Sequence, residues 1–244
     1  MTGPSHVIWV HYLPVVTTVV AALFCVSLAR RYRERPRALQ MLWWAVGVAC
    51  YGLGTLIEAA ITISGNTVLL NKAWYMAGAI LGGYPLAQGS LFFSYRRRFA
   101  WRATAISLPS VLIACVLVAA SPVVPGALQA YRPSGAILAW RWVRLMTPFI
   151  NGYSAFFLIG GAAASAWRFY RARGTGHRAA GNLLIAVGAL LPGVGGSFAK
   201  AGLVEALYVG ECLGLVLIWV GERVCALRPS RAGELAAIRE PAAS

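Results

Sequence analysis

Two glutamates, Glu58 and Glu211, lie inside long apolar stretches of the chain. An ionisable group in a membrane-spanning helix is costly and by default marks a functional site. At 1.5 Å per residue, both carboxyls are expected in the same half of the membrane, roughly 7–8 Å and 12 Å below the ends of their segments. Such a pair could bind a cation or exchange a proton. The alternative is structural, with Glu58 paired to Lys72 or Lys200 and Glu211 forming one interhelical hydrogen bond.

Further polar and aromatic residues fall at depths from which they could line the same cavity. If the second, third, fifth and seventh apolar segments surround a central space, we expect a polar pocket open to the outside. Pro85 and Pro192, each near several glycines, weaken helical hydrogen bonding. Such breaks accompany binding sites in transporters, although kinks that only shape a bundle are as common. The candidate ligand- or ion-binding residues are Glu58, Glu211, Trp74, Tyr84, Gln88, Asn151 and Tyr153.

The sequence offers little for metal, cofactor or hydrolytic chemistry. Its five cysteines lie in or at the ends of apolar segments, and none are spaced as CxxC. Of its three histidines, two lie near the N-terminus and one in a basic loop. We therefore expect no metal site, no cofactor and no catalytic residue. An intramembrane enzyme using Glu58 and Glu211 as an acid–base pair is the least favoured reading.

The composition is that of an integral membrane protein. Of the 244 residues, 59% are hydrophobic and 12% charged, and the mean hydropathy is +0.67. A bilayer core of roughly 30 Å needs about 20 apolar residues per helix. We predict an all-α bundle of seven transmembrane helices within residues 1–226, followed by a short tail, 227–244. The predicted spans are 7–29, 41–63, 73–95, 103–121, 146–167, 180–199 and 203–225.

The basic residues predict the orientation of these spans. Seventeen of the 22 Lys and Arg residues follow segments one, three, five and seven, and the rest lie on the other side. Because basic residues favour the cytoplasmic side, we expect a cell-membrane protein with its N-terminus outside and its C-terminus in the cytoplasm. The net charge of +15 then reflects contact with anionic lipids at the cytoplasmic face and not nucleic acid.

An internal repeat is also predicted. Residues 27–35 match 165–173 at five of nine positions, and 45–54 match 186–195 at five of ten. Residues 7–95 and 146–225 would then be parallel halves joined by a linker helix at 103–121. The alternative is that arginine-rich loops and glycine-rich helices match by chance.

This three-plus-one-plus-three plan is similar to that of the SWEET and PQ-loop proteins, the PnuC vitamin transporters and, more loosely, the microbial rhodopsins. Their motifs are absent. The seventh segment carries Glu211 and no lysine for a retinal Schiff base. The adjacent Pro-Gln pair of PQ-loop proteins is also missing, because two residues separate Pro85 from Gln88. The predicted parallel repeat, the interrupted helices and the two buried carboxylates together predict a transporter of a small molecule or ion. The alternative is a receptor or sensor that signals through a separate cytoplasmic partner, and a homo-oligomer is left open.

Overall fold

The computed structural model describes residues 9–172 and 174–227, and within them the chain is helical apart from turns and two isolated β-bridges. The side chain of Lys200 and nearly all of the predicted tail, 227–244, lie outside the described part. The helical elements are η1 (Trp9–Tyr12), α1 (Leu13–Glu34), α2 (Leu39–Ser64), α3 (Val68–Trp74), the π-helix η2 (Tyr75–Ile80), α4 (Tyr84–Ser94), α5 (Arg97–Ala120), η3 (Gly135–Ile137), α6 (Arg141–Ala155), the π-helix η4 (Phe156–Gly160), α7 (Gly161–Arg171), α8 (Gly176–Lys200) and α9 (Val204–Ala226).

Six helical runs in the described part are long and apolar enough to cross a membrane. They coincide with six of the seven predicted segments, so a multi-pass helical membrane protein is confirmed. The run formed by α6, η4 and α7 is the longest, at 31 residues. The six runs are Val10–Glu34, Leu39–Ser64, Arg97–Ala120, Arg141–Arg171, Gly176–Ala199 and Val204–Ala226.

The third predicted segment, 73–95, is not one continuous helix. It begins earlier, at α3, passes through the π-helix η2, and breaks at a turn before α4. Pro85 occupies the first turn of α4 and has no N–H to continue the hydrogen-bond ladder from η2. The Leu81 N–H bonds to the Met76 carbonyl, 2.9 Å away, which is the i-to-i−5 bond that ends the π-helix. The proline and glycines noted in the sequence therefore do interrupt this segment.

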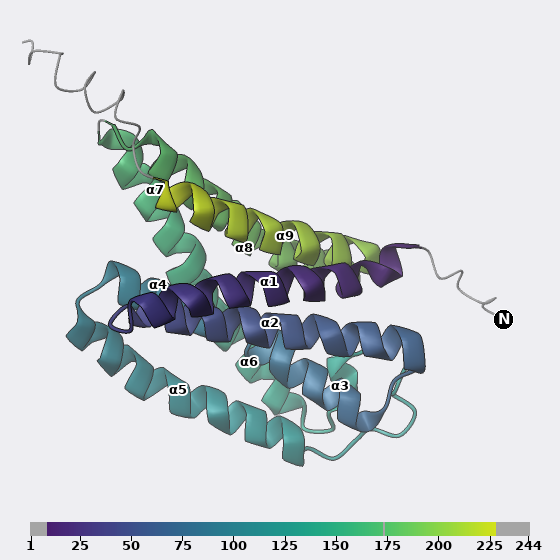
Figure 1. Ribbon diagram of the computed structural model, residues 1–244. Coiled ribbons are helices and arrows are strands. Elements are labelled where there is room, and N and C mark those ends of the chain that lie inside the picture. The colour runs from purple at the N-terminus through teal and green to yellow at the C-terminus, as the bar shows by residue number, and fades with distance from the viewer. Residues whose placement is uncertain (1–8, 173, 228–244) are drawn as a thin grey trace, which may run out of the picture.

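The helices form two layers that share a long bent connection (Figure 1). In one layer α1 packs against α9, and α9 pairs along its length with α8. In the other, α2 packs on α4 and η2, with α5 and α6 beyond them. The bent run begins with α6 against α4 and α5 and ends with α7 against α8. The two layers meet where α1 lies on α2.

The pairing of α8 with α9 depends on glycines that let the two backbones touch. A Cβ placed on Gly214 of α9 would lie 2.5 Å from the Gly188 carbonyl oxygen of α8 and 3.0 Å from Cδ of Pro192. A Cβ on Gly188 would in turn lie 2.6 Å from the Gly214 oxygen. Small residues allow this close approach in membranes, where packing and not hydrophobicity holds helices together.

The connection between α5 and α6 folds onto the neighbouring helix ends. Asn66 donates from Nδ2 to the carbonyls of Gln129 (2.9 Å) and Arg132 (3.1 Å). Asn71 donates to the Ser134 carbonyl at 2.8 Å. Arg132 reaches across to the Ala199 carbonyl of α8, also at 2.9 Å. The connection thus ties the end of α8 to the beginning of α3.

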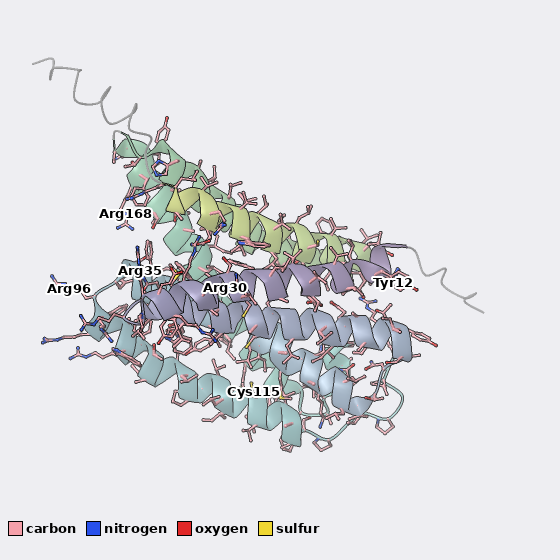
Figure 2. The ribbon with its side chains drawn as sticks, in the orientation of Figure 1. Tyr12, Arg30, Arg35, Arg96, Cys115 and Arg168 are labelled. Carbon is pink, nitrogen blue, oxygen red and sulfur yellow. The ribbon has the colours of Figure 1, made fainter. Side chains whose placement is uncertain are left out.

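The arginines gather at one end of the bundle. Figure 2 shows Arg35, Arg96 and Arg168 at the end opposite Tyr12. These residues follow or end α1, α4 and α7, as the alternation of basic residues in the sequence requires. We call this the arginine-rich end, and the other, where α2, α5 and α8 finish, the opposite end.

Candidate functional site

The two glutamates singled out by the sequence meet between α2 and α9. The carboxyl groups of Glu58 and Glu211 are within hydrogen-bonding reach of each other. Glu58 is only 2% exposed, and although Glu211 is half-buried, the Oε2 atoms of both residues are buried and lack a hydrogen-bond partner. A hydrogen bond between two carboxyl groups needs a proton on one of them, because two carboxylates have only acceptors. The site is therefore suited to hold a proton.

Hydroxyl groups lie near the two carboxyl groups of Glu58 and Glu211, which we call the acid pair. Tyr51 lies two turns from Glu58 on α2, and its hydroxyl donates to the Glu211 carbonyl at 3.0 Å. Thr55 lies between Tyr51 and Glu58, and its hydroxyl is 3.0 Å from that of Thr18 on α1. The polar site thus extends over α1, α2 and α9 within an otherwise apolar bundle.

Tyr208 borders the acid pair one turn before Glu211 on α9. It is 2% exposed, and both glutamates act on it electrostatically. Its ring packs edge-on against the His11 ring, with centroids 5.9 Å apart. Arg132 also acts on Tyr208. Tyr208 therefore lies between the acid pair and the opposite end of the bundle.

Lys72 does not pair with Glu58, although it was one of the two partners considered from the sequence; the side chain of the other, Lys200, lies outside the described residues. Its ammonium group donates to the carbonyls of Ala119 (2.8 Å) and Ser121 (2.7 Å), at the C-terminus of α5. A cation is stabilised there because the last carbonyls of a helix are unpaired and carry partial negative charge. Each carboxyl of the pair interacts with the other.

A second polar cluster is centred on Gln88 of α4. The Gln88 amide nitrogen donates to the hydroxyls of Ser107 (3.1 Å) and Tyr153 (2.9 Å), and its oxygen accepts from Thr104 at 2.9 Å. The Tyr84 hydroxyl is 2.8 Å from that of Ser107. The structure thus brings Tyr84, Gln88 and Tyr153 together, as the sequence predicts. In the described residues, no hydrogen bond joins this cluster to the acid pair, which lies on the α9 side of α2.

This cluster is satisfied within itself, so we expect it to stabilise the bundle. Gln88→Leu removes one hydrogen-bond partner from Thr104 and Ser107, which keep backbone carbonyl acceptors, and leaves the half-buried Tyr153 hydroxyl without its partner, at a cost of about 1–3 kcal/mol. Asn151→Leu is the matched control, because that amide is exposed on α6. Thermal unfolding of the purified variants should show a lower midpoint for Gln88→Leu alone. Equal midpoints for both variants would contradict a structural role for the network.

Two predicted site residues lie away from both clusters. Asn151 is on the exposed face of α6 and does not point into the bundle interior. Trp74, at the end of α3, packs into the apolar core with its ring against Tyr75, the centroids being 6.3 Å apart. The structure therefore does not bring all seven candidate residues into a single pocket.

A third polar contact joins α1 and α9 at the arginine-rich end. Arg31 forms an ion pair with Glu222, which is 8% exposed. The Oε2 atom of Glu222 is buried without a hydrogen-bond partner. Helix α9 thus carries two acidic contacts, Glu211 against α2 and Glu222 against α1.

Sequence reasoning missed several partners of the candidate residues. Thr104 and Ser107 lie three positions apart on α5, and Tyr208 lies three before Glu211. Residues three apart share a helix face, so their spacing was a usable signal. Within the described part of the chain, no group of three or more His, Cys, Asp and Glu residues could hold a metal ion.

Comparison of the chain with protein families, with curated proteins and with solved structures found no match.

Proposed function

We propose that the protein is a proton-coupled transporter of a small molecule or ion in the cell membrane, in which Glu58 and Glu211 together bind the coupling proton. The observation that carries this proposal is the contact between two carboxyl groups in the interior of a membrane bundle. Ionisable groups are retained at such positions mainly for proton relays and ion pathways. A purely structural contact between α2 and α9 would not require two acids.

The proposed topology has seven crossings. The run α3–η2–α4 supplies the seventh, since at about 1.5 Å per residue it is long enough for a core of roughly 30 Å despite its break. With the arginine-rich end in the cytoplasm, the N-terminus is outside and the acid pair lies in the outer half. The internal repeat stays a prediction, and its proposed halves differ locally because α9 is continuous whereas α3–η2–α4 is broken.

The chemistry of the pair suggests how a proton would be coupled to motion. With one shared proton, the carboxyls attract and hold α2 to α9. With none, two carboxylates repel each other in a low-dielectric site. Loss of the proton therefore favours separation of the helices or entry of a cation between them. A lower outer pH favours the closed, protonated contact, and a higher outer pH favours its opening.

A pH jump on oriented membranes tests the proposal without knowledge of the substrate. Lowering the pH on the outer side from an alkaline value to neutral should load the pair with its proton and give a transient current on a solid-supported membrane. We expect Glu58→Gln and Glu211→Gln each to remove the current, because neither variant retains two acids.

Glu205→Gln is the control for this measurement. Glu205 lies on the same helix, in the first turn of α9, outside the acid pair. This variant should keep the wild-type current. A current that persists in Glu58→Gln and Glu211→Gln would remove these residues from the mechanism.

A further inference from the structure

A cleft of about 310 Å³ opens at the arginine-rich end between the end of α4 and the bent run η4–α7. Its six lining residues are Ser94, Tyr95, Gly161, Ala164, Trp167 and Arg168. None of them is acidic. The volume falls at the lower end of the range of small-molecule sites, about 300–1,000 Å³. The cleft is separate from the acid pair and lies between α4, which packs on α2 in one layer, and α7, which packs on α8 of the other.

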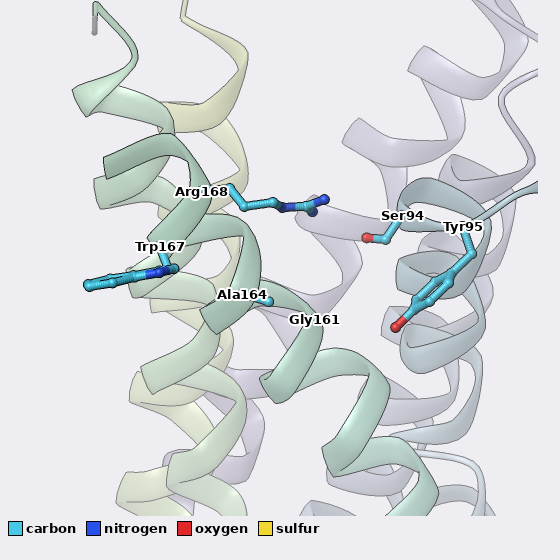
Figure 3. A pocket seen from close by; sticks show the side chains of 6 residues that line it. All are labelled: Ser94, Tyr95, Gly161, Ala164, Trp167 and Arg168. Atoms are coloured by element: carbon cyan, nitrogen blue, oxygen red, sulfur yellow. The ribbon is translucent and has the colours of Figure 1, made fainter. Parts of the chain in front are cut away.

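Figure 3 shows how polar and apolar groups are distributed in this cleft. The Arg168 side chain extends across it toward the Ser94 hydroxyl, and the Tyr95 ring forms the far wall. Gly161 and Ala164 form the side toward the middle of the bundle. The Trp167 side chain points away from the cleft. The guanidinium carbon of Arg171 lies over its ring, 4.4 Å from the ring centroid. One part of the cleft thus carries a cation and hydroxyl groups, and the part along Gly161 and Ala164 is an apolar groove.

Most hydrogen-bond donors of the Arg168 guanidinium are available to a ligand. A guanidinium carries five N–H donors, and among the described residues that of Arg168 donates to one acceptor, the Ser165 hydroxyl, at 3.1 Å. This bond fixes the side chain over the cleft. Three further arginines, Arg96, Arg97 and Arg98, follow Tyr95 directly and are exposed. The local charge is therefore positive, and the complementary ligand is an anion.

We propose that this cleft binds one anionic phospholipid of the inner leaflet, with its phosphate on Arg168 and Ser94 and its glycerol and upper acyl chain along Gly161 and Ala164. Charge complementarity selects an anionic headgroup, and guanidinium groups bind phosphate in a bidentate way. The cleft lies where α4 and α7 end, and the ends of helices that span a bilayer lie near the lipid headgroups. The bound lipid would wedge between α4 and α7 and hold the two layers together.

Native mass spectrometry and thermal unfolding of delipidated protein test this proposal. One molecule of phosphatidylglycerol should remain bound to each wild-type protein and raise its unfolding midpoint. Phosphatidylcholine with the same acyl chains should do neither. Arg168→Gln should weaken retention of phosphatidylglycerol by about tenfold or more, because a charge-assisted hydrogen bond is lost.

Two further variants make the result specific. Arg171→Gln removes the same charge one turn along α7 but outside the cleft, and it should retain the lipid as the wild type does. Gly161→Leu keeps every charge and fills the groove; a Cβ at Gly161 meets nothing within 4 Å, so this variant should fold. We expect it to lose the retained lipid.

The outcomes separate the proposal from its competitors. Equal retention by Arg168→Gln and Arg171→Gln would overturn it in favour of a diffuse basic surface. Equal stabilisation by phosphatidylcholine, or by inorganic phosphate alone, would overturn the assignment to an anionic lipid. Unchanged retention in Gly161→Leu would place the lipid elsewhere. None of these results bears on the proton-binding pair.

Discussion

Gly214→Leu is expected to separate α8 from α9 and to destabilise the protein by about 3 kcal/mol or more, because overpacking a close contact forces backbones apart. At this position the two backbones already touch, with the added Cβ only 2.5 Å from the Gly188 carbonyl oxygen. A carbonyl in a helix cannot move aside as a flexible side chain can. The added carbons beyond Cβ would also meet Pro192.

Thermal unfolding in detergent, followed by tryptophan fluorescence, measures this effect. Gly193→Leu is the matched control, since a Cβ at this exposed glycine of α8 meets nothing within 4 Å. We expect a large fall in midpoint or poor expression for Gly214→Leu and near wild-type behaviour for Gly193→Leu. Equal behaviour of the two variants would mean that α8 and α9 do not pack as described.

Arg31→Gln is expected to give the second large loss of stability. It leaves Glu222 buried on α9 without the guanidinium that neutralises it, and breaking a buried pair from one side costs about 3–5 kcal/mol. Arg31 is itself 25% exposed, so water at the arginine-rich end reduces this cost to roughly 2–3 kcal/mol. Glu222→Gln should cost less, because an arginine at that depth can extend to water.

A double-mutant cycle isolates the ion pair. Arg31→Gln with Glu222→Gln should be more stable than Arg31→Gln alone, since no unpaired acid then remains in the interface. Unfolding midpoints of the four proteins provide the measurement. Strictly additive effects would show that Arg31 and Glu222 do not interact in the membrane protein.

Hydropathy was sufficient to place the long helices but not to define every boundary. The fifth predicted span, 146–167, is part of a longer run, Arg141–Arg171, that continues past the apolar centre through charged ends. Composition marks where a helix is apolar, whereas its termini depend on hydrogen bonding and on loops. The break before α4 was indicated by Pro85 and its neighbouring glycines, because their effect on backbone hydrogen bonds is local.

Contacts between distant helices were beyond sequence reasoning. Glu58 and Glu211 were expected at similar depths, since depth follows from position along a helix. Their contact also requires that α9 lie beside α2, and nothing in one sequence specifies that neighbour. Asn151 was also grouped with Tyr153, although two positions along a helix are about 200° apart, more than half a turn, and therefore point to different surroundings.

Infrared spectroscopy of the membrane-embedded protein tests the shared proton most directly. The chain has seven acidic residues, all of them glutamates, so ¹³C-labelling of the glutamate carboxyls reports on few groups. At neutral pH we expect the carbonyl stretch of a protonated carboxyl in the wild type and in Glu205→Gln. The band should be absent or strongly displaced in Glu58→Gln and in Glu211→Gln. A wild-type spectrum with only ionised carboxylates at neutral pH would contradict a proton held between Glu58 and Glu211.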